Sequence, residues 1–125
     1  MSTYADLEER LVDFAVGVLA LAELLPSTYA GQHIARQILR SGTSPAPNYA
    51  EARAAESRRD FVHKLRIAHK ELNETRIWLH IIQRSTLLPR TRTETLRLAC
   101  DELCRILGAS IQTARQRRSS PVDDR

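Results

Sequence analysis

The chain has 125 residues, of which 42% are hydrophobic and 27% charged, and its formal net charge is +4. This composition is that of an ordinary globular domain, so it excludes a disordered or fibrous class, and the length suits a single domain. With only four Gly and five Pro, the chain offers little material for the turns of an all-β protein, so we expect an all-α fold.

The most apolar stretch, residues 12–25, is not expected to cross a membrane. It contains Asp13 and Glu23 and is shorter than the roughly 20 apolar residues of a membrane-spanning helix. It also lacks the basic leader and small-residue cleavage site of a signal peptide. Cys100 and Cys104 lack the Cys-x-x-Cys spacing of zinc and redox sites. We predict reduced core cysteines in a cytoplasmic protein.

The first predicted helix begins near Asp6. Its apolar residues recur at spacings of three and four, the pattern of one helical face: Leu7, Leu11, Phe14, Val18, Leu21 and Leu25. A second apolar stripe beside this face consists of Val12, Val16 and Leu19. The combined width indicates two contact surfaces. Pro26 ends the helix and Ser27 and Thr28 can cap the next one, so the tight connection predicts antiparallel helices.

The second predicted helix starts near Thr28 and carries Ile34, Ile38 and Leu39 on its apolar side. It then meets the sequence Ser-Gly-Thr-Ser-Pro-Ala-Pro at residues 41–47. Each proline removes a backbone donor and crowds the preceding turn, yet residues 48–52 are again compatible with a helix. We expect one helix kinked at the prolines, with two separate helices as the alternative.

The third predicted helix starts with a cap, in which Ser57 is the N-cap and Asp60 an acidic residue of the first turn. It has the strongest periodic signal in the chain, with spacings that alternate between four and three as in a bundle seam. The seam consists of Phe61, Leu65, Ala68, Leu72, Thr75, Leu79 and Ile82. Ile77, Trp78 and Ile81 make its last turns apolar on a second side.

The fourth predicted helix runs from about Thr91 to Arg117, after the break at Leu87-Leu88-Pro89. One face carries Leu96, Ala99, Leu103, Ile106, Ser110 and Ala114. A second stripe carries Cys100, Cys104, Leu107 and Ile111. Together the helices predict an up-down four-helix bundle with a Pro-kinked second helix, a single domain over residues 1–118, and a disordered polar tail over residues 119–125.

The sequence lacks the patterns that carry catalysis or bind metals. None of the four histidines has a second His four residues away or a Glu three residues before it, so the di-iron bundle signature is missing. Neither a Gly-rich phosphate loop nor a nucleophile elbow occurs. We therefore expect a non-enzymatic protein with no catalytic residue, no metal and no cofactor.

Arginine is the main candidate for ligand contact. Of the 19 basic residues, all but Lys64 and Lys70 are Arg, which suits planar, bidentate contact with phosphate. Residues 84–118 hold eight arginines against three acids, a basic balance typical of contact with a nucleic-acid backbone. These candidates are Arg84, Arg90, Arg92, Arg97, Arg105, Arg115, Arg117 and Arg118. A GC-rich genome would enrich Arg as well, and aromatic residues, at 5%, do not support a single-strand stacking platform.

Three polar residues, Asn48, Glu51 and Glu74, stand in helical and partly apolar contexts. One interpretation is that all three are exposed. The alternative is a satisfied buried network, with Arg58 or Arg76 as a cation, that fixes the kinked segment against the third helix.

Three segments carry a family resemblance: RSGTS at residues 40–44, NYAEA at 48–52 and ESRRDFVHKLRIAHKELNET at 56–75. They resemble the bacterial four-helix bundle proteins first noticed in intervening sequences of 23S rRNA genes, most closely over residues 36–88. The most specific signal is a combined Asn-x-x-Glu and Ser-x-x-Asp-Phe motif. Its residues, with one later acid, are Asn48, Glu51, Ser57, Asp60, Phe61 and Glu74. The family commonly has one proline or a Gly-Ala pair at the kink, whereas here Pro45 and Pro47 flank Ala46.

This resemblance implies an up-down bundle that assembles into a homopentamer. The fold is also similar to that of the accessory variability protein of diversity-generating retroelements, a basic pentamer that engages a reverse transcriptase and nucleic acid. By that likeness we expect a homo-oligomer, with a pentamer as the implied form, that binds RNA or DNA through the arginines and acts as an accessory to another machine such as a reverse transcriptase. The alternative is a structural scaffold or protein-interaction module with no nucleic-acid role.

Overall fold

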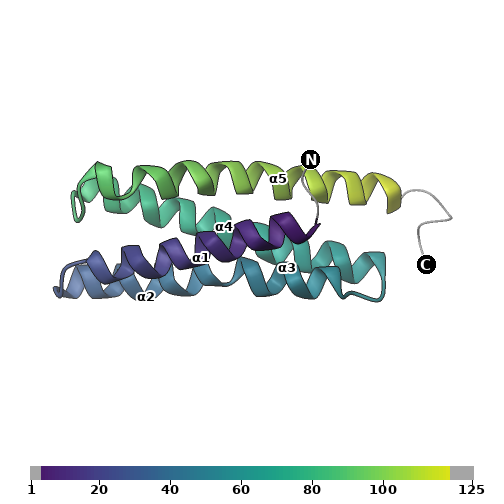
Figure 1. Cartoon of the computed structure of the whole chain (residues 1–125), viewed down its shortest axis with the longest axis horizontal. Coiled ribbons are helices and arrows are strands. Elements are labelled where there is room, and N and C mark those ends of the chain that lie inside the picture. Colours follow the sequence, from purple (N-terminus) through teal and green to yellow (C-terminus); the bar gives the residue numbers. More distant parts are fainter. Residues whose placement is uncertain (1–3, 119–125) are drawn as a thin grey trace.

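The computed structural model describes residues 4–118, and all its regular secondary structure is helical (Figure 1). The elements are α1 (Tyr4–Leu24), α2 (Tyr29–Thr43), α3 (Pro45–Arg53), α4 (Arg58–Ser85), the 3-10 helix η1 (Arg90–Arg92) and α5 (Glu94–Arg118). The predicted all-α class and four-helix bundle are confirmed. The predicted disordered tail, residues 119–125, lies outside the described residues.

The helices are long rods that lie side by side in up-down order (Figure 1). α2 and α3 follow each other along the bundle and together act as one of its four helices. This rod packs against α1 on one side and α4 on the other, while α5 packs mainly against α4 and also contacts α1. Among the described helices, none is long and apolar enough to span a bilayer.

The kink expected at the prolines lies between α2 and α3 and is confirmed as a bend in the second rod. Ser44, the residue between the two helices, has helical backbone angles of φ −75° and ψ −35°. Pro45 and Pro47 have no amide hydrogen to offer to the carbonyls one turn earlier, so the helical ladder is interrupted there. It resumes with the Asn48 amide, which donates to the Ser44 carbonyl at 3.2 Å.

Two of the predicted helix starts are capped as expected. The Thr28 hydroxyl accepts from the Gly31 amide at 3.1 Å at the start of α2. The Ser57 hydroxyl accepts from the Asp60 amide at 3.1 Å at the start of α4. Each cap satisfies an amide that has no partner within its helix.

The last helix starts later than predicted. Residues from Arg90 form a 3-10 turn, closed by the Arg92 amide donating to the Pro89 carbonyl at 2.9 Å. The chain turns again at Thr93 before α5 begins at Glu94. The start predicted at about Thr91 is therefore wrong by three residues, because the segment after the proline favours a tight turn over continuous α-helix.

The core runs along the bundle axis and contains the predicted seams of α1 and α4. The six predicted face residues of the first helix are buried. In α4 the seam is buried from Leu65 to Ile82, whereas Phe61 is half-buried and packs against the edge of the core. The second stripe of the first helix remains exposed, as do Ile77 and Ile81 of α4.

In α5 the buried line combines residues of both predicted faces. It consists of Cys100, Leu103, Leu107, Ile111 and Ala114. Leu96, Ala99, Ile106 and Ser110, expected on one face with Leu103 and Ala114, are half-buried. Both stripes are apolar enough to form a core face, so the choice depends on how α5 is rotated against α4.

Candidate nucleic-acid interface

The candidate arginines lie at both ends of the bundle. Where α4 passes into α5, which we call the hairpin end, lie Arg84, Arg90, Arg92 and Arg97. Near the other end of α5, which we call the tail end, lie Arg115 and Arg117. Arg105 lies between them, and the Arg118 side chain is outside the described part of the structure. Since the 25 residues of α5 span about 37 Å, these arginines do not form one compact surface.

Two of the hairpin-end arginines are engaged in ion pairs within the chain. Arg97 places Nη2 at 2.6 Å from Glu94 and Nη1 at 3.0 Å from Asp101, and its side chain is only 20% exposed. Arg90 donates from Nε to the same Glu94 at 2.9 Å. Hydrogen bonds from Arg97 and then Arg90 lower the pKa of Glu94, so this carboxylate stays ionised.

The remaining candidates with described side chains are exposed. They are Arg84, Arg92, Arg105, Arg115 and Arg117, and within residues 4–118 none of them forms an ion pair with a described acid. Glu102, an acid that could have neutralised an arginine of its own helix, instead pairs with Arg10 of α1 at 2.6 Å. The exposed cations at the hairpin end are therefore Arg84 and Arg92, beside the partly engaged Arg90.

A hollow of about 330 Å³ opens at the hairpin end. It is lined by His80, Gln83, Arg84, Arg90 and Arg97, and each of these side chains carries nitrogen donors. The Gln83 amide donates to the Thr93 hydroxyl at 2.8 Å, which ties this wall of the hollow to the start of α5. This concave site therefore brings three arginines together.

The tail end has a hollow of different character, about 380 Å³ in volume. Its lining includes Phe61, Ile106 and Ala109, with Arg58 and Arg117 as the cations. Because much of this wall is apolar, it is less suited to a phosphate group than the hairpin-end hollow.

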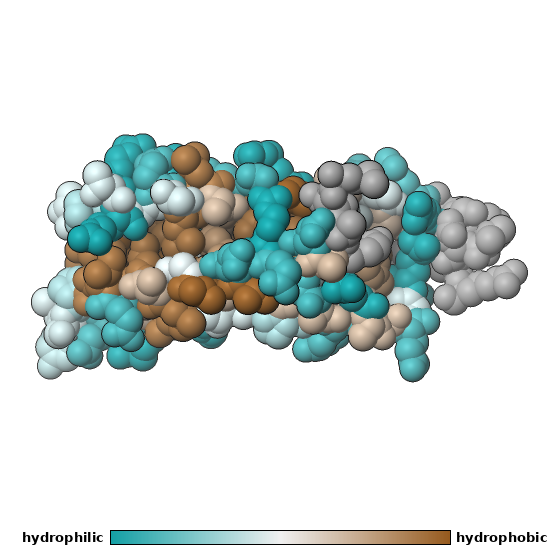
Figure 2. All heavy atoms as spheres, in the orientation of Figure 1, coloured by the Kyte–Doolittle hydropathy of each residue, from teal (hydrophilic) through white to brown (hydrophobic). Residues whose placement is uncertain are grey.

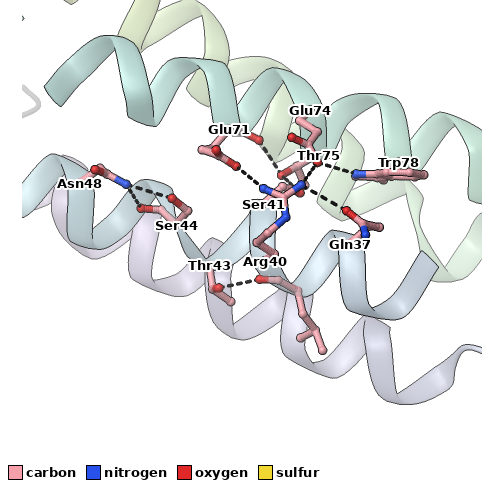
Figure 3. A network of polar contacts seen from close by, with 11 residues as sticks. Gln37, Arg40, Ser41, Thr43, Ser44, Asn48, Glu71, Glu74, Thr75 and Trp78 are labelled. Carbon is pink, nitrogen blue, oxygen red and sulfur yellow. Dashed lines mark hydrogen bonds and ion pairs between the residues drawn. The ribbon is translucent and has the colours of Figure 1, made fainter. Parts of the chain in front are cut away.

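A separate polar network lies near the kink and includes Glu74, one residue of the family-like motif (Figure 3). Arg40 of α2 donates from Nη1 to Glu71 at 3.2 Å and from Nη2 to Glu74 and Gln37. The indole of Trp78 also donates to Glu74, at 3.0 Å. These contacts tie the end of α2 to the middle of α4.

Beneath this network lies a buried hydroxyl pair. The Thr75 and Ser41 hydroxyls are 2.9 Å apart, both residues are fully buried, and Thr75 also bonds to the Glu71 carbonyl at 2.8 Å (Figure 3). Across the kink, the side-chain amide of Asn48 donates from Nδ2 to the Ser44 carbonyl at 3.0 Å and to the Ser44 hydroxyl at 2.9 Å. The Asn48 side chain thus bonds to the one residue between α2 and α3, at the point where the prolines interrupt the backbone ladder.

The three polar residues do not form one buried network, because Asn48 bonds to Ser44 while Glu51 and Glu74 pair with different cations. Glu74 pairs with Arg40, and Glu51, whose side chain is 57% exposed, pairs with Lys64 at 2.8 Å, so the cations in these two ion pairs are Arg40 and Lys64. The hydrogen bond from Lys64 to Glu51 raises the pKa of Lys64. Spacing along α4 alone did not reveal Arg40, because its partners lie more than 30 positions away in the sequence.

The two cysteines are free thiols, as predicted. Cys100 is buried and donates to the Leu72 carbonyl at 3.3 Å. Hydrogen bonding with Cys104, together with burial, raises the pKa of Cys100, while the same contact lowers that of Cys104. A buried thiol held neutral in this way serves packing between α4 and α5. Among the described residues, no group of His, Cys, Asp or Glu is arranged to hold a metal ion.

Comparison with known proteins agrees with the sequence resemblance. The family model for 23S rRNA-intervening sequence proteins matches residues 6–109. A crystal structure of a protein of unknown function from the S23 ribosomal protein family of Bacteroides thetaiotaomicron is 36% identical, with a TM-score of 0.79, and the match covers 84% of this chain and 97% of that one. No curated protein matches. The chain belongs to the 23S rRNA-intervening sequence protein family.

Proposed function

We propose that this protein is a non-enzymatic homo-oligomer, with a pentamer as the implied form, that binds the backbone of RNA or DNA through arginines at the hairpin end. The observation that carries the proposal is the exposure of Arg84 and Arg92 at the hairpin end, where Arg84 lines a hollow together with Arg90 and Arg97. A guanidinium offers several donors in one plane, which matches the oxygens of a phosphate. In this role the protein acts as an accessory to another nucleic-acid machine, such as a reverse transcriptase.

Oligomerisation makes this small cationic surface sufficient. One subunit offers only a few phosphate contacts at its hairpin end, and the tail-end arginines of α5 lie about 30 Å away. Several copies on one nucleic acid bind with an effective concentration that raises the overall affinity without any new contact. The proposal therefore links backbone binding to assembly.

Exposed apolar side chains support assembly. Val12, Val16 and Leu19 of α1 are 41%, 58% and 49% exposed. Figure 2 shows apolar atoms gathered along α1 and between α1 and α5, toward the hairpin end. A continuous apolar surface of this kind favours association with another protein surface.

A second candidate function is a scaffold with no nucleic-acid role. It is favoured by the ion pairs of Arg90 and Arg97 with Glu94 and Asp101, since these cations are partly neutralised within the chain. Under this alternative the remaining exposed arginines serve solubility, and the apolar face of α1 carries the protein's interactions.

The test is to measure binding of purified protein to a structured RNA and a duplex DNA across a salt series, with molar mass determined in the same buffers. The proposal predicts a multimer whose log affinity falls linearly as log salt concentration rises, because phosphate contacts release counterions. A multimer that binds neither nucleic acid at low salt supports the scaffold instead. A monomer that binds contradicts the link to assembly.

A further inference from the structure

We infer that the hairpin-end hollow is a binding site for a single phosphate group, and that Glu94 limits its affinity by pairing with two of the three arginines that line it. The inference deepens the proposed function and rests on it for the source of the phosphate, which is the nucleic acid. The lining side chains can be replaced one at a time, so the affinity of the hollow for free phosphate can be measured separately from nucleic-acid binding.

Arg84 and Arg90 supply the available donors. Arg84 is exposed, and the Arg90 side chain is 74% exposed. Arg90 uses Nε for Glu94, and no described ion pair involves its two terminal nitrogens. Those nitrogens, together with the Arg84 guanidinium, can form the parallel hydrogen bonds that a phosphate accepts.

Arg97 supplies a fixed positive charge in the wall. Both of its terminal nitrogens are held, one by Glu94 and one by Asp101, and its Nε is buried without a hydrogen-bond partner. A side chain already ordered in this way loses little conformational entropy when a ligand arrives. The Arg97 charge can therefore attract a phosphate in the hollow with little loss of side-chain entropy on binding.

The side chains, rather than the helix ends, set the sign of the potential here. The carboxyl end of α4 and the amino end of α5 meet at the hairpin end, and their opposite dipoles largely cancel. The lining carries Arg84, Arg90 and Arg97, while Glu94 bonds to the last two. An incoming phosphate must compete with this carboxylate, so neutralising it should tighten binding.

The experiment is a calorimetric titration with inorganic phosphate at constant ionic strength. Glu94→Gln, which keeps the size of the side chain and removes its charge, should tighten phosphate binding by about tenfold, because a like charge near the anion is lost. Arg84→Ala should weaken it by about tenfold. The control is Arg66→Ala, which removes one exposed arginine from α4 outside the hollow and should leave the affinity within about twofold.

Circular dichroism of each variant checks that the bundle is folded, and Gln83→Ala gives a second lining variant, which should also weaken phosphate binding. The inference is overturned if phosphate does not bind, or if Glu94→Gln and Arg84→Ala change its affinity no more than the control does. Nucleic-acid binding that persists in that case leaves the proposed function standing without this site. Phosphate binding with the expected variant effects, but no nucleic-acid binding, keeps the site and refutes the proposed function.

Two RNA oligonucleotides of one sequence, with a 5′-phosphate or a 5′-hydroxyl, identify the source of the phosphate. Tighter binding of the 5′-phosphorylated RNA that Arg84→Ala abolishes assigns the site to a chain end. Equal binding of both, weakened equally by Arg84→Ala, assigns it to internal phosphates. If Arg84→Ala affects neither RNA, the hollow does not bind nucleic-acid phosphate.

Discussion

Replacing Gly42 with Ala should destabilise the bundle, although alanine is the better helix former. Gly42 is buried near the end of α2, where this helix packs against Val18 of α1. An added Cβ would lie 2.7 Å and 2.8 Å from the two γ-carbons of Val18, closer than side-chain carbons pack. Val18 is fully buried and β-branched, so it has little freedom to turn away. The helices must therefore separate to admit the methyl group.

The magnitude follows from two opposing effects. Forcing an extra methyl group into a packed core costs about 1–3 kcal/mol. Replacing Gly by Ala inside a helix returns roughly 1 kcal/mol. Because the added methyl group would collide with both γ-carbons of a buried side chain, its cost belongs in the upper part of that range, about 2–3 kcal/mol. We therefore expect a net loss of about 1–2 kcal/mol in the free energy of unfolding.

Gly108→Ala is the matched control, because it makes the same chemical change within α5. Its Cβ would meet the His69 ring at 3.5 Å, an ordinary contact. This variant should therefore be more stable than the wild type by roughly 0.5–1 kcal/mol. The same Gly→Ala substitution is thus expected to lower the free energy of unfolding at Gly42 and to raise it at Gly108.

The assay is urea unfolding followed by circular dichroism, at a fixed protein concentration because association adds to apparent stability. Val18→Ala combined with Gly42→Ala should cost less than the sum of the two single changes, since the double variant removes the collision. If Gly42→Ala is as stable as the wild type while Gly108→Ala is stabilised, the close approach of α1 and α2 is refuted.

Three further predictions concern single contacts. Ser57→Ala should lower the free energy of unfolding by about 1 kcal/mol because the Asp60 amide loses its cap. Ser57→Asp should retain most of the stability that the cap provides, and urea unfolding measures both variants. Thr75→Val should cost about 1–3 kcal/mol because the buried Ser41 hydroxyl loses a partner, and Thr75→Ser should cost less; equal losses would rule out the hydrogen bond as the cause. The ion pairs lower the pKa of Glu94 in the folded state, so they add stability above its unfolded pKa of 4.5 that is lost as the pH falls through the folded value. In unfolding measured from about pH 3 to 7, wild type and Glu94→Gln should differ most at the upper end, and a constant difference would contradict this assignment.

Local signals in the sequence predicted much of the fold. The cap at Ser57 and the seam from Leu65 to Ile82 depend on residues three or four positions apart, and the structure has both. The proline kink is equally local, since it follows from amides that Pro45 and Pro47 do not have. Such features need no knowledge of the neighbouring helices.

The features that depend on neighbouring helices could not be predicted in the same way. Two apolar stripes on α5 compete for the core, and only packing against α4 selects the line that includes Leu107 and Ile111. The partnership of Arg40 with Glu71 and Glu74 likewise joins two helices.

The candidate site was only partly visible in the sequence. The arginines and their concentration toward the two ends of the last helix could be identified from the sequence, but not which of them form ion pairs within the chain. Nor could the sequence reveal that Glu94 is shared by Arg90 and Arg97, because that depends on the side-chain conformations at the start of α5. Glu94, an acidic residue shared by two of the arginines, was therefore not among the residues predicted for the site.

The central claim is tested most directly by the salt dependence of binding to a structured RNA and to a duplex DNA in two double variants. Arg84→Ala with Arg92→Ala removes two exposed arginines at the hairpin end, and Arg36→Ala with Arg66→Ala removes two exposed arginines elsewhere. Binding through the hairpin end predicts that the first variant flattens the plot of log affinity against log salt by about one unit or more, while the control keeps the wild-type slope. Equal slopes for the two variants, or a wild-type protein that does not bind at all, would contradict the account.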